Sequence, residues 1–209
     1  GGNNSTFACR VLTSSGTDFY SSIAAAVGAL KGFRHGGANI KVVEMMQYLR
    51  NAVRDWKDDG QVKDQLVRIL NRELGDGTGL IYGMGHAVYT LSDPRAEILK
   101  QFSRHLAEKR GMVDQLDLIE SVERLAPQVF QEVRGIDKPI CANVDLYSGF
   151  VYRLLGIPTD LYTAIFASAR MAGWCAHRME ECCSDDPRII RPAYKTVCKR
   201  VPYVPLPDR

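Results

Sequence analysis

The spacing of apolar residues constrains the fold of this chain more than any other feature. Between Asn39 and about Asp58 they recur in steps of three and four, at Val42, Met46, Leu49, Val53 and Trp56. Such steps keep side chains on one face of an α-helix, whereas a half-buried strand would alternate. The same pattern recurs over residues 17–33, 62–69, 93–106, 118–129, 145–155 and 159–181. We therefore predict an all-α fold.

Helix faces and ends follow from the same pattern. The helix over 17–33 should bury a stripe of Ile23, Val27 and Leu30, and the helix that opens at Asp93 should turn Leu99, Phe102 and Leu106 inward. Asp93 is expected to cap that helix, with Pro94 in its first position. Pro127 should kink its helix or restart it. Only residues 79–82 and 188–191 could pair as short strands.

Composition and charge exclude several classes of protein. The 209 residues are 45% hydrophobic and 24% charged, enough for one large domain or two small ones. No run approaches the roughly 18 apolar residues of a membrane span. With 27 basic and 24 acidic residues the charge is too balanced for nucleic-acid binding. Six cysteines without paired CxxC spacing predict reduced thiols in a cytoplasmic protein, with no metal site. The N-terminal segment "GGNNSTFACR" has neither an initiator Met nor a signal-peptide pattern, so we expect that it is a cut or processed start.

Three ionisable residues next to glycines are the first candidates for chemistry. His35 in "FRHGGAN", His86 in "GMGHAVY" and Asp145 in "ANVDLYSG" are expected to lie between helices. Two histidines and a carboxylate in such loops fit acid–base catalysis, because histidine exchanges protons near neutral pH. The alternatives are structural loop histidines and an Asp145 that only caps the next helix.

Three arginines and one glycine-rich loop complete the candidates. Arg170 lies in the apolar stretch "FASARMAGW", where its guanidinium needs a partner, either a bound carboxylate or an internal salt bridge; Arg95 and Arg191 are further candidates. "GMG" lacks the third glycine of a dinucleotide fingerprint. It could offer backbone groups to an adenine or an acyl-carrier ligand, or be a tight turn.

These motifs, in this order, resemble those of the citrate synthase family. The segments that carry the likeness are "NNSTFACR", "GALKGFRHGGAN", "GMGHAVYTLSDPRA", the long block "NVDLYSGFVYRLLGIPTDLYTAIFASARMAGWCAHRMEE" and "RIIRP". The resemblance runs from Asn3 to about Tyr194 and corresponds to the C-terminal half of a family member. It implies a multi-helical fold, with a small CoA-facing domain over 37–155 between large-domain segments at 1–36 and 156–209.

The resemblance also implies roles in the condensation of acetyl-CoA with oxaloacetate to citrate and CoA. His35 would donate a hydrogen bond to the thioester carbonyl while Asp145 removes a methyl proton. His86 would polarise the ketone of oxaloacetate. Arg95 and Arg170 would hold its carboxylates, and Arg191 would reach into the site of a second subunit in a homodimer. CoA would contact Gly83, Met84, Gly85 and Ala87.

The CoA thioester is a substrate on this reading, so no cofactor and no metal are expected. The Ala-rich stretch 21–30 resembles dimer-interface helices of the family. Three departures stand out: Thr90 and Ala193 occupy positions where many relatives carry cations, and a further substrate-binding histidine of the family would lie three residues before Asn3. Two alternatives remain, a 2-methylcitrate synthase that uses propionyl-CoA and a non-catalytic fragment that binds CoA or dimerises.

Overall fold

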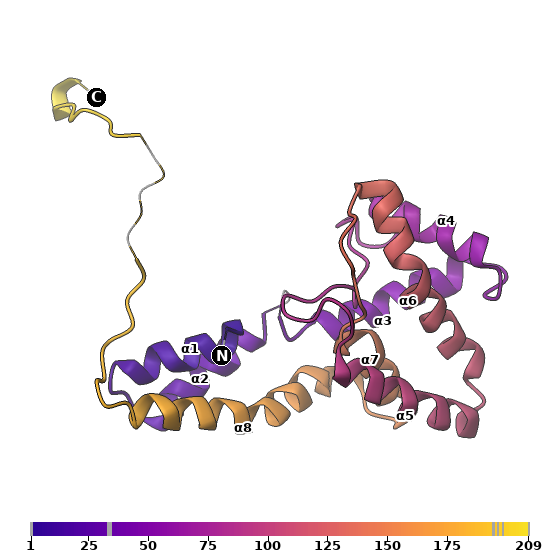
Figure 1. Ribbon diagram of the computed structural model, residues 1–209, viewed down its shortest axis with the longest axis horizontal. Helices are drawn as coiled ribbons and strands as arrows, with labels where there is room; N and C mark the ends of the chain where they lie inside the picture. Colours follow the sequence, from indigo (N-terminus) through magenta and orange to yellow (C-terminus); the bar gives the residue numbers. More distant parts are fainter. Residues whose placement is uncertain (1, 33–34, 194, 196, 198, 209) are drawn as a thin grey trace.

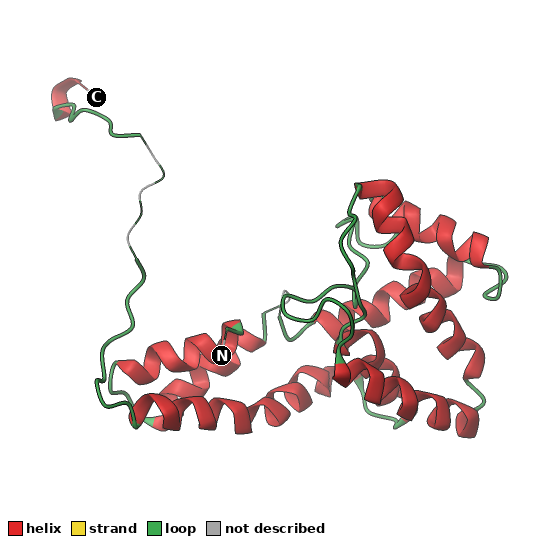
Figure 2. Ribbon diagram, viewed as in Figure 1, coloured by secondary structure: helices red, strands yellow, loops and turns green. Residues whose placement is uncertain are grey.

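The chain is almost entirely helical, as Figure 2 shows. The computed structural model describes residues 2–32, 35–193, 195, 197 and 199–208, and these form eight α-helices and two short 3₁₀ helices. The all-α prediction is confirmed. The predicted strands are wrong: within the described residues only an isolated antiparallel bridge joins Met84 to Ala142. Residues 79–82 cannot run as a strand because Gly79 has a left-handed φ of 73°.

Three helices form one group around a small apolar core. α1 (Asn4–Ser14), α2 (Phe19–Leu30) and α8 (Tyr162–Cys182) lie side by side (Figure 1). Their core comprises Cys9, Ile23, Ala26, Leu30 and Trp174. Ile23 and Leu30 were predicted to be buried, but Val27 is 38% exposed because α2 turns Ala26 inward instead. The other face of α2 thus exposes apolar side chains, among them Tyr20.

Five helices form a second group around a larger core. These are α3 (Ala38–Ala52), α4 (Asp59–Leu70), α5 (Pro94–Arg110), α6 (Val113–Arg134) and α7 (Val144–Leu154). α4 packs on α6, while α7 packs on both α3 and α5. The central buried side chains include Val42, Leu49, Val62, Leu66, Leu116, Val122, Val129, Leu146 and Tyr147. The N-termini of α5 and α7 lie together, because the Val144 N–H donates to Asp93. The candidate residues Arg95 and Asp145 lie in the first turns of these two helices.

Three local predictions need correction. α3 ends at Ala52, so Trp56 lies beyond it, because Val53 is already extended. α6 continues through Pro127 without restarting, since buried residues on both sides of the proline hold it to the core. Phe102 on α5 is 61% exposed, whereas Leu99 and Leu106 pack against the core as predicted, beside the buried Ala96, Ser103 and Ala107. Small residues there let α5 approach α7 closely.

Beyond α8 the chain leaves the helices. The Ile190 backbone N–H donates to Ser14 Oγ at 3.0 Å, which ties this segment to the end of α1. The 3₁₀ helix η2 (Leu206–Asp208) lies apart from the helical body (Figure 1).

The described cysteines at positions 9, 141, 175, 182 and 183 are all free thiols, and Cys198 lies outside the described residues. Among the described helices none has the length and apolarity to cross a bilayer. The large-domain and small-domain boundaries remain a prediction.

Candidate active site

The loop that carries His86 is fixed to the segment just before α7. The Asn143 N–H donates to Gly83 O at 2.8 Å, and the Gly85 N–H donates to Cys141 O at 2.7 Å. The Asn143 side chain adds a bond from Nδ2 to Gly85 O at 2.8 Å. Since Asn143 also caps α7, one residue sets both the loop and the start of the helix.

Gly83 fits this arrangement only without a side chain. Its φ is +83°, and a Cβ there would lie 2.9 Å from the Cα of Leu146 on α7. Gly83→Ala should therefore lower the free energy of unfolding by about 2–4 kcal/mol, from backbone strain plus the clash. Thermal and urea unfolding would measure the loss.

Gly16→Ala is the matched control for that variant. Gly16 has a similar φ of +80° but nothing within 4 Å of a Cβ. It should cost about 1 kcal/mol, from the backbone conformation alone. Equal losses in the two variants would contradict the close approach of Gly83 to α7.

The ring of His86 is held in one tautomer. Its Nδ1 accepts hydrogen bonds from the backbone N–H groups of Val88 at 3.0 Å and Tyr89 at 3.2 Å. A neutral imidazole that accepts at Nδ1 carries its proton on Nε2. That Nε2 lies 3.3 Å from Nη2 of Arg95. The His86 Nε2–H and the Arg95 Nη2–H are therefore two neighbouring hydrogen-bond donors, and an oxygen atom of a ligand could accept from both.

Asp93 holds Arg95 in this position. The carboxylate of Asp93 is fully buried and accepts from Arg95 Nε at 3.0 Å and Nη2 at 2.8 Å. It also accepts from the backbone N–H of Arg95 at 3.0 Å and of Val144 at 3.2 Å, which confirms it as the cap of α5 and links α5 to α7. The side-chain bond to Asp93 raises the pKa of Arg95 and keeps its guanidinium charged.

Asp145 lies in the first turn of α7, not in a loop as predicted. Asn143 is the cap, and its Oδ1 accepts from the Asp145 N–H at 3.0 Å. The alternative that Asp145 only caps this helix is therefore wrong. Burial raises the pKa of the Asp145 carboxyl to about 6, although the nearby Arg95 charge opposes the shift. A carboxylate with such a pKa is a stronger base than an ordinary one and is still ionised at neutral pH.

The raised pKa makes folding stability depend on pH. The carboxyl of an unfolded Asp145 has its ordinary pKa of about 3.8 and the folded one a pKa of about 6, so the folded state binds more protons between these pH values. Its contribution to stability therefore falls as pH rises from about 4 through 6 and then stays constant. Asp145→Asn should remove this term and be more stable than wild type by about 1–3 kcal/mol at pH 8. Urea unfolding at pH 4 and 8 tests it: a variant less stable than wild type at pH 8 would contradict the buried charge.

His35 contacts the three-helix group through Ser5. Its Nε2 lies 3.0 Å from Ser5 Oγ, which also accepts from Trp174 Nε1 at 3.3 Å. The Ser5 hydroxyl proton can point to His35 or to Asn3 Oδ1, 2.9 Å away. Burial, and then the charge of Arg170, lower the pKa of His35. His35 is therefore neutral at pH 7 and able to donate one hydrogen bond.

Arg170 on α8 is a half-buried cation without a full set of partners. Its guanidinium stacks 5.0 Å from the Phe166 ring centroid. Within the described part of the chain, its buried Nη1 has no hydrogen-bond partner. Burial, and then the charge of Arg95, lower the pKa of Arg170. An internal salt bridge, the alternative to a ligand, is not made by the described residues, so a bound carboxylate is the remaining candidate partner.

The charges connect five of the six candidates. The charge of Arg170 lowers the pKa of His35, and the charge of Arg95 lowers the pKa values of Arg170 and Asp145. Arg95 also contacts His86. Arg191 is not brought to this cluster within one chain. It is exposed, and its neighbour Ile190 is hydrogen-bonded to Ser14 at the end of α1.

Comparison with known proteins identifies the family. The family model described as "Citrate synthase, C-terminal domain" matches residues 1–193. The chain belongs to the citrate synthase family. Citrate synthase of Deinococcus radiodurans is 37% identical over 210 residues, which cover 100% of this chain and 51% of that protein. A 2-methylcitrate synthase of Shewanella oneidensis is 37% identical over 191 residues, 91% of this chain and 45% of that protein. The chain thus spans about half the length of the curated relatives it matches.

Solved citrate synthase structures share the fold. The enzyme of Thermotoga maritima superposes with a TM-score of 0.74 at 35% identity, covering 99% of this chain and 52% of that one. The citrate synthase of the archaeon Thermoplasma acidophilum, in ternary complex with carboxymethyl coenzyme A and oxaloacetate, gives 0.72 at 33% identity, covering 98% and 50%. The multi-helical family fold predicted from the sequence is confirmed.

A cavity of about 280 Å³ opens beside His86 in this member of the citrate synthase family. Met84 and Gly85 line it and Gly83 and Ala87 do not, while the CoA contacts of all four residues stay a prediction. Gly83 faces α7 instead. Thr90 and Lys138 are also in the lining. Lys138 therefore supplies the cavity with a cation, although Thr90 is neutral.

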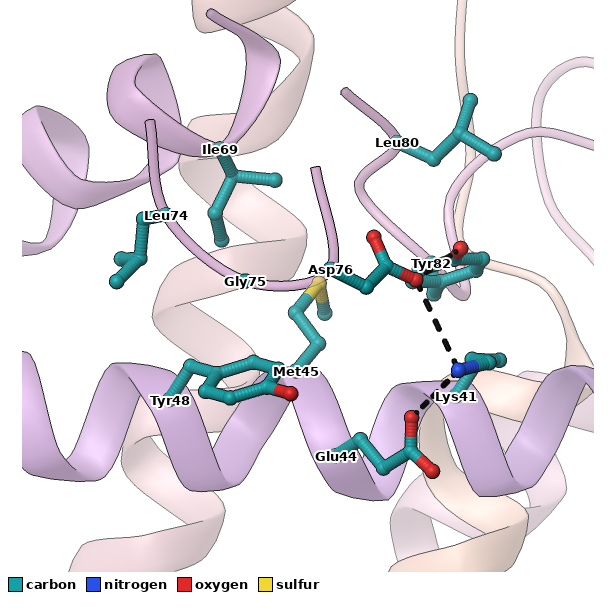
Figure 3. Close-up of a pocket in the computed structure, with 10 residues that line it drawn as sticks. All are labelled: Lys41, Glu44, Met45, Tyr48, Ile69, Leu74, Gly75, Asp76, Leu80 and Tyr82. Atoms are coloured by element: carbon teal, nitrogen blue, oxygen red, sulfur yellow. Dashed lines mark hydrogen bonds and ion pairs between the residues drawn. The ribbon is translucent and has the colours of Figure 1, made fainter. Parts of the chain in front are cut away.

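Figure 3 shows how the segment before the His86 loop, which includes Asp76 and Tyr82, is anchored to α3. Lys41 on α3 pairs with Glu44 at 2.7 Å and approaches Asp76 at 3.8 Å. Asp76 in turn accepts from the Tyr82 hydroxyl at 2.7 Å. This polar cluster links Tyr82, the residue before Gly83, to α3 through Asp76 and Lys41. The pocket drawn in Figure 3 is small, about 10 Å³, which is room for about one water molecule.

Sequence reasoning missed four residues that shape the site. Ser5 and Trp174 hold His35, Asn143 fixes the loop and the helix start, and the Tyr89 ring packs 4.9 Å from the ring centroid of His86. Only Asn143 carried a local signal, as a good capping residue before an apolar run.

Proposed function

We propose that the protein condenses acetyl-CoA with oxaloacetate and water to give citrate and CoA. The observation that carries the proposal is the meeting of the His86 Nε2–H and the Arg95 guanidinium, two donors 3.3 Å apart, beside the raised-pKa carboxylate of Asp145. Donors for a developing oxyanion next to a base are what an enolisation and carbonyl addition require. Membership of the citrate synthase family supports the choice of reaction.

The first step on this proposal forms the nucleophile. Asp145 removes a proton from the methyl carbon of acetyl-CoA, and His35 donates a hydrogen bond to the thioester oxygen on which charge develops. A thioester methyl is a very weak acid, so the base works only if that oxygen is stabilised at once. For His35 to donate from Nδ1, the Ser5 hydroxyl proton must point to its Nε2, while Trp174 donates to Ser5 Oγ.

The second step joins the two substrates. His86 Nε2–H polarises the ketone of oxaloacetate, and the enol carbon attacks the ketone carbon to form the new C–C bond. Arg95 and Arg170 hold the two carboxylates, which would give the unpartnered Nη1 of Arg170 its acceptor. Water then cleaves the thioester, which releases CoA and citrate. Fixing both substrates in line removes much of the entropic cost of their meeting.

CoA would lie along the 280 Å³ cavity beside Met84 and Gly85. The ternary complex of the Thermoplasma acidophilum enzyme with carboxymethyl coenzyme A and oxaloacetate supports both substrates. We further propose a homodimer in which α2 lies in the interface and Arg191 reaches the partner's site. The exposed Phe19, Tyr20 and Val27 of α2 support this, because an uncovered apolar face favours association.

The likeness to a 2-methylcitrate synthase favours a second candidate substrate, propionyl-CoA. One extra methylene changes specificity by only about 10- to 200-fold, so pocket shape decides. Turnover of the two acyl-CoAs by the complete gene product, compared as kcat/KM, distinguishes them. A preference for propionyl-CoA would replace acetyl-CoA in the proposal.

The test of the reaction itself is release of CoA from acetyl-CoA with and without oxaloacetate. The complete gene product should release CoA only when oxaloacetate is present. The 209-residue chain alone should show little activity, because it spans about half of its relatives' length. Failure of the complete protein to release CoA would favour the non-catalytic alternative.

A further inference from the structure

A pair of arginines outside the candidate active site lacks acidic partners. Arg50, in the last turn of α3, and Arg153, in the last turn of α7, both donate to the same atom, Oε1 of Gln115 on α6, with Arg50 Nη1 at 3.4 Å. Arg50 also donates to Gln47 Oε1 at 2.6 Å. All of these acceptors are neutral. Two guanidiniums that converge on one neutral oxygen repel each other unless an anion joins them.

The acidic residues of the packed helices are already paired elsewhere. The only acid of α3 pairs with a lysine of the same helix, and each acid of α6 pairs with another cation: Glu44 with Lys41, Asp114 with Lys57, Asp117 and Glu120 with Arg104, Glu123 with Lys100, and Glu132 with Lys63. The one acid of α7, Asp145, lies in its first turn, at the end opposite Arg153. Within the described residues no salt bridge is made by Arg50 or Arg153.

The surroundings make this pair unlike a solvated surface patch. Both guanidiniums are half-buried, and burial, followed for Arg50 by the charge of Arg153, lowers their pKa values. They line a cavity of about 20 Å³ whose remaining walls are mainly apolar side chains of α3, α6 and α7. That volume admits one oxygen atom. In addition, the N-terminus of α6 starts beside them without a side-chain cap, which adds a partial positive charge.

We infer that Arg50, Arg153 and Gln115 form a binding site for a small oxyanion, a phosphate or carboxylate group, where α3, α6 and α7 meet. One oxygen enters the cavity and the others accept from the two guanidiniums at its mouth. The site is separate from the proposed reaction. It joins the C-terminal ends of two helices, of which α3 starts just after His35 and α7 carries Asp145 in its first turn. An anion there restrains α3 against α7.

The test is phosphate binding by the complete gene product, followed by calorimetry and thermal unfolding in Hepes at constant ionic strength with chloride as the reference anion. Arg50→Gln and Arg153→Gln should each bind phosphate about tenfold or more weakly than wild type, since a charge-assisted hydrogen bond is lost. Arg54→Gln is the matched control, because that side chain is exposed and only four residues from Arg50. It should bind like wild type.

Arg95 and Arg170 also attract anions, so the difference between variants decides the assignment. Phosphate affinity equal in Arg50→Gln, Arg153→Gln and Arg54→Gln would overturn the inference. So would an absence of phosphate binding in the wild type, whether the pair is merely solvated or covered by a carboxylate from outside this sequence.

Arg153→Glu gives a second, opposite signature. It places a carboxylate beside Arg50, so it should raise the unfolding midpoint without phosphate and abolish the further increase that phosphate gives. A lower midpoint with an unchanged phosphate response would contradict the site. The result does not depend on catalytic activity, so it can fail or succeed independently of the proposed function.

Discussion

Asp145→Asn should lower turnover of the complete enzyme by about 10²–10⁴-fold, the usual contribution of a positioned general base. Asparagine keeps the size of the side chain and the backbone N–H bond to Asn143, but its amide cannot take a proton. Because the lost interaction belongs to the transition state, kcat should fall while KM for both substrates changes little. Steady-state kinetics at pH 8 measures the effect.

A pH profile and a control variant separate catalysis from structure. The kcat/KM of wild type should fall below about pH 6, where Asp145 becomes protonated. Asp160→Asn, at an exposed position in the 3₁₀ helix η1 (Thr159–Leu161), should leave turnover unchanged. Exchange of the acetyl-CoA methyl protons for deuterium should be lost only in Asp145→Asn. Turnover of Asp145→Asn within a few-fold of wild type would exclude Asp145 as the base.

The helices were predictable because each must bury one face. The stripe of Val42, Met46 and Leu49 is entirely buried, as its spacing predicts. Periodicity does not say which of two overlapping stripes packs, however. On α5 the small residues Ala96 and Ala107 are buried, while the larger Phe102 faces outward.

The candidate site could be predicted only in part, because several of its contacts join residues that lie far apart in the sequence. Sequence could place Asp93 as a helix cap, but not its second role, since Val144 is 51 positions away. The contact between Trp174 and Ser5 spans 169 positions. Asp145 was predicted in a loop because Asn143 and Asp145, two positions apart, are both of a residue type that caps helices, and the sequence does not say which of them begins α7. Asn143 caps the helix because its side chain can accept from Asp145 and also donate to Gly85.

His86→Asn should lower kcat by about 10²–10³-fold, the usual cost of losing one oxyanion donor. An asparagine Oδ1 can still accept the N–H groups of Val88 and Tyr89, as His86 Nδ1 does, so the loop keeps its shape. It has no donor at the place of Nε2, however, so on the proposed mechanism the ketone would lose its polarising hydrogen bond. His86→Gln, whose longer amide reaches further, should lose less. Kinetics with saturating oxaloacetate measures both.

His105→Asn serves as the matched control because that histidine is exposed on α5, and it should behave like wild type. Binding of acetyl-CoA should be nearly unchanged in His86→Asn, since the cavity lining at Met84 and Gly85 is intact. A loss of acyl-CoA binding with little change in kcat would reassign His86 to the CoA contact. That outcome would remove the His86 Nε2–H from the ketone and leave the hydrogen bond to the ketone to Arg95, whose guanidinium lies 3.3 Å from that nitrogen.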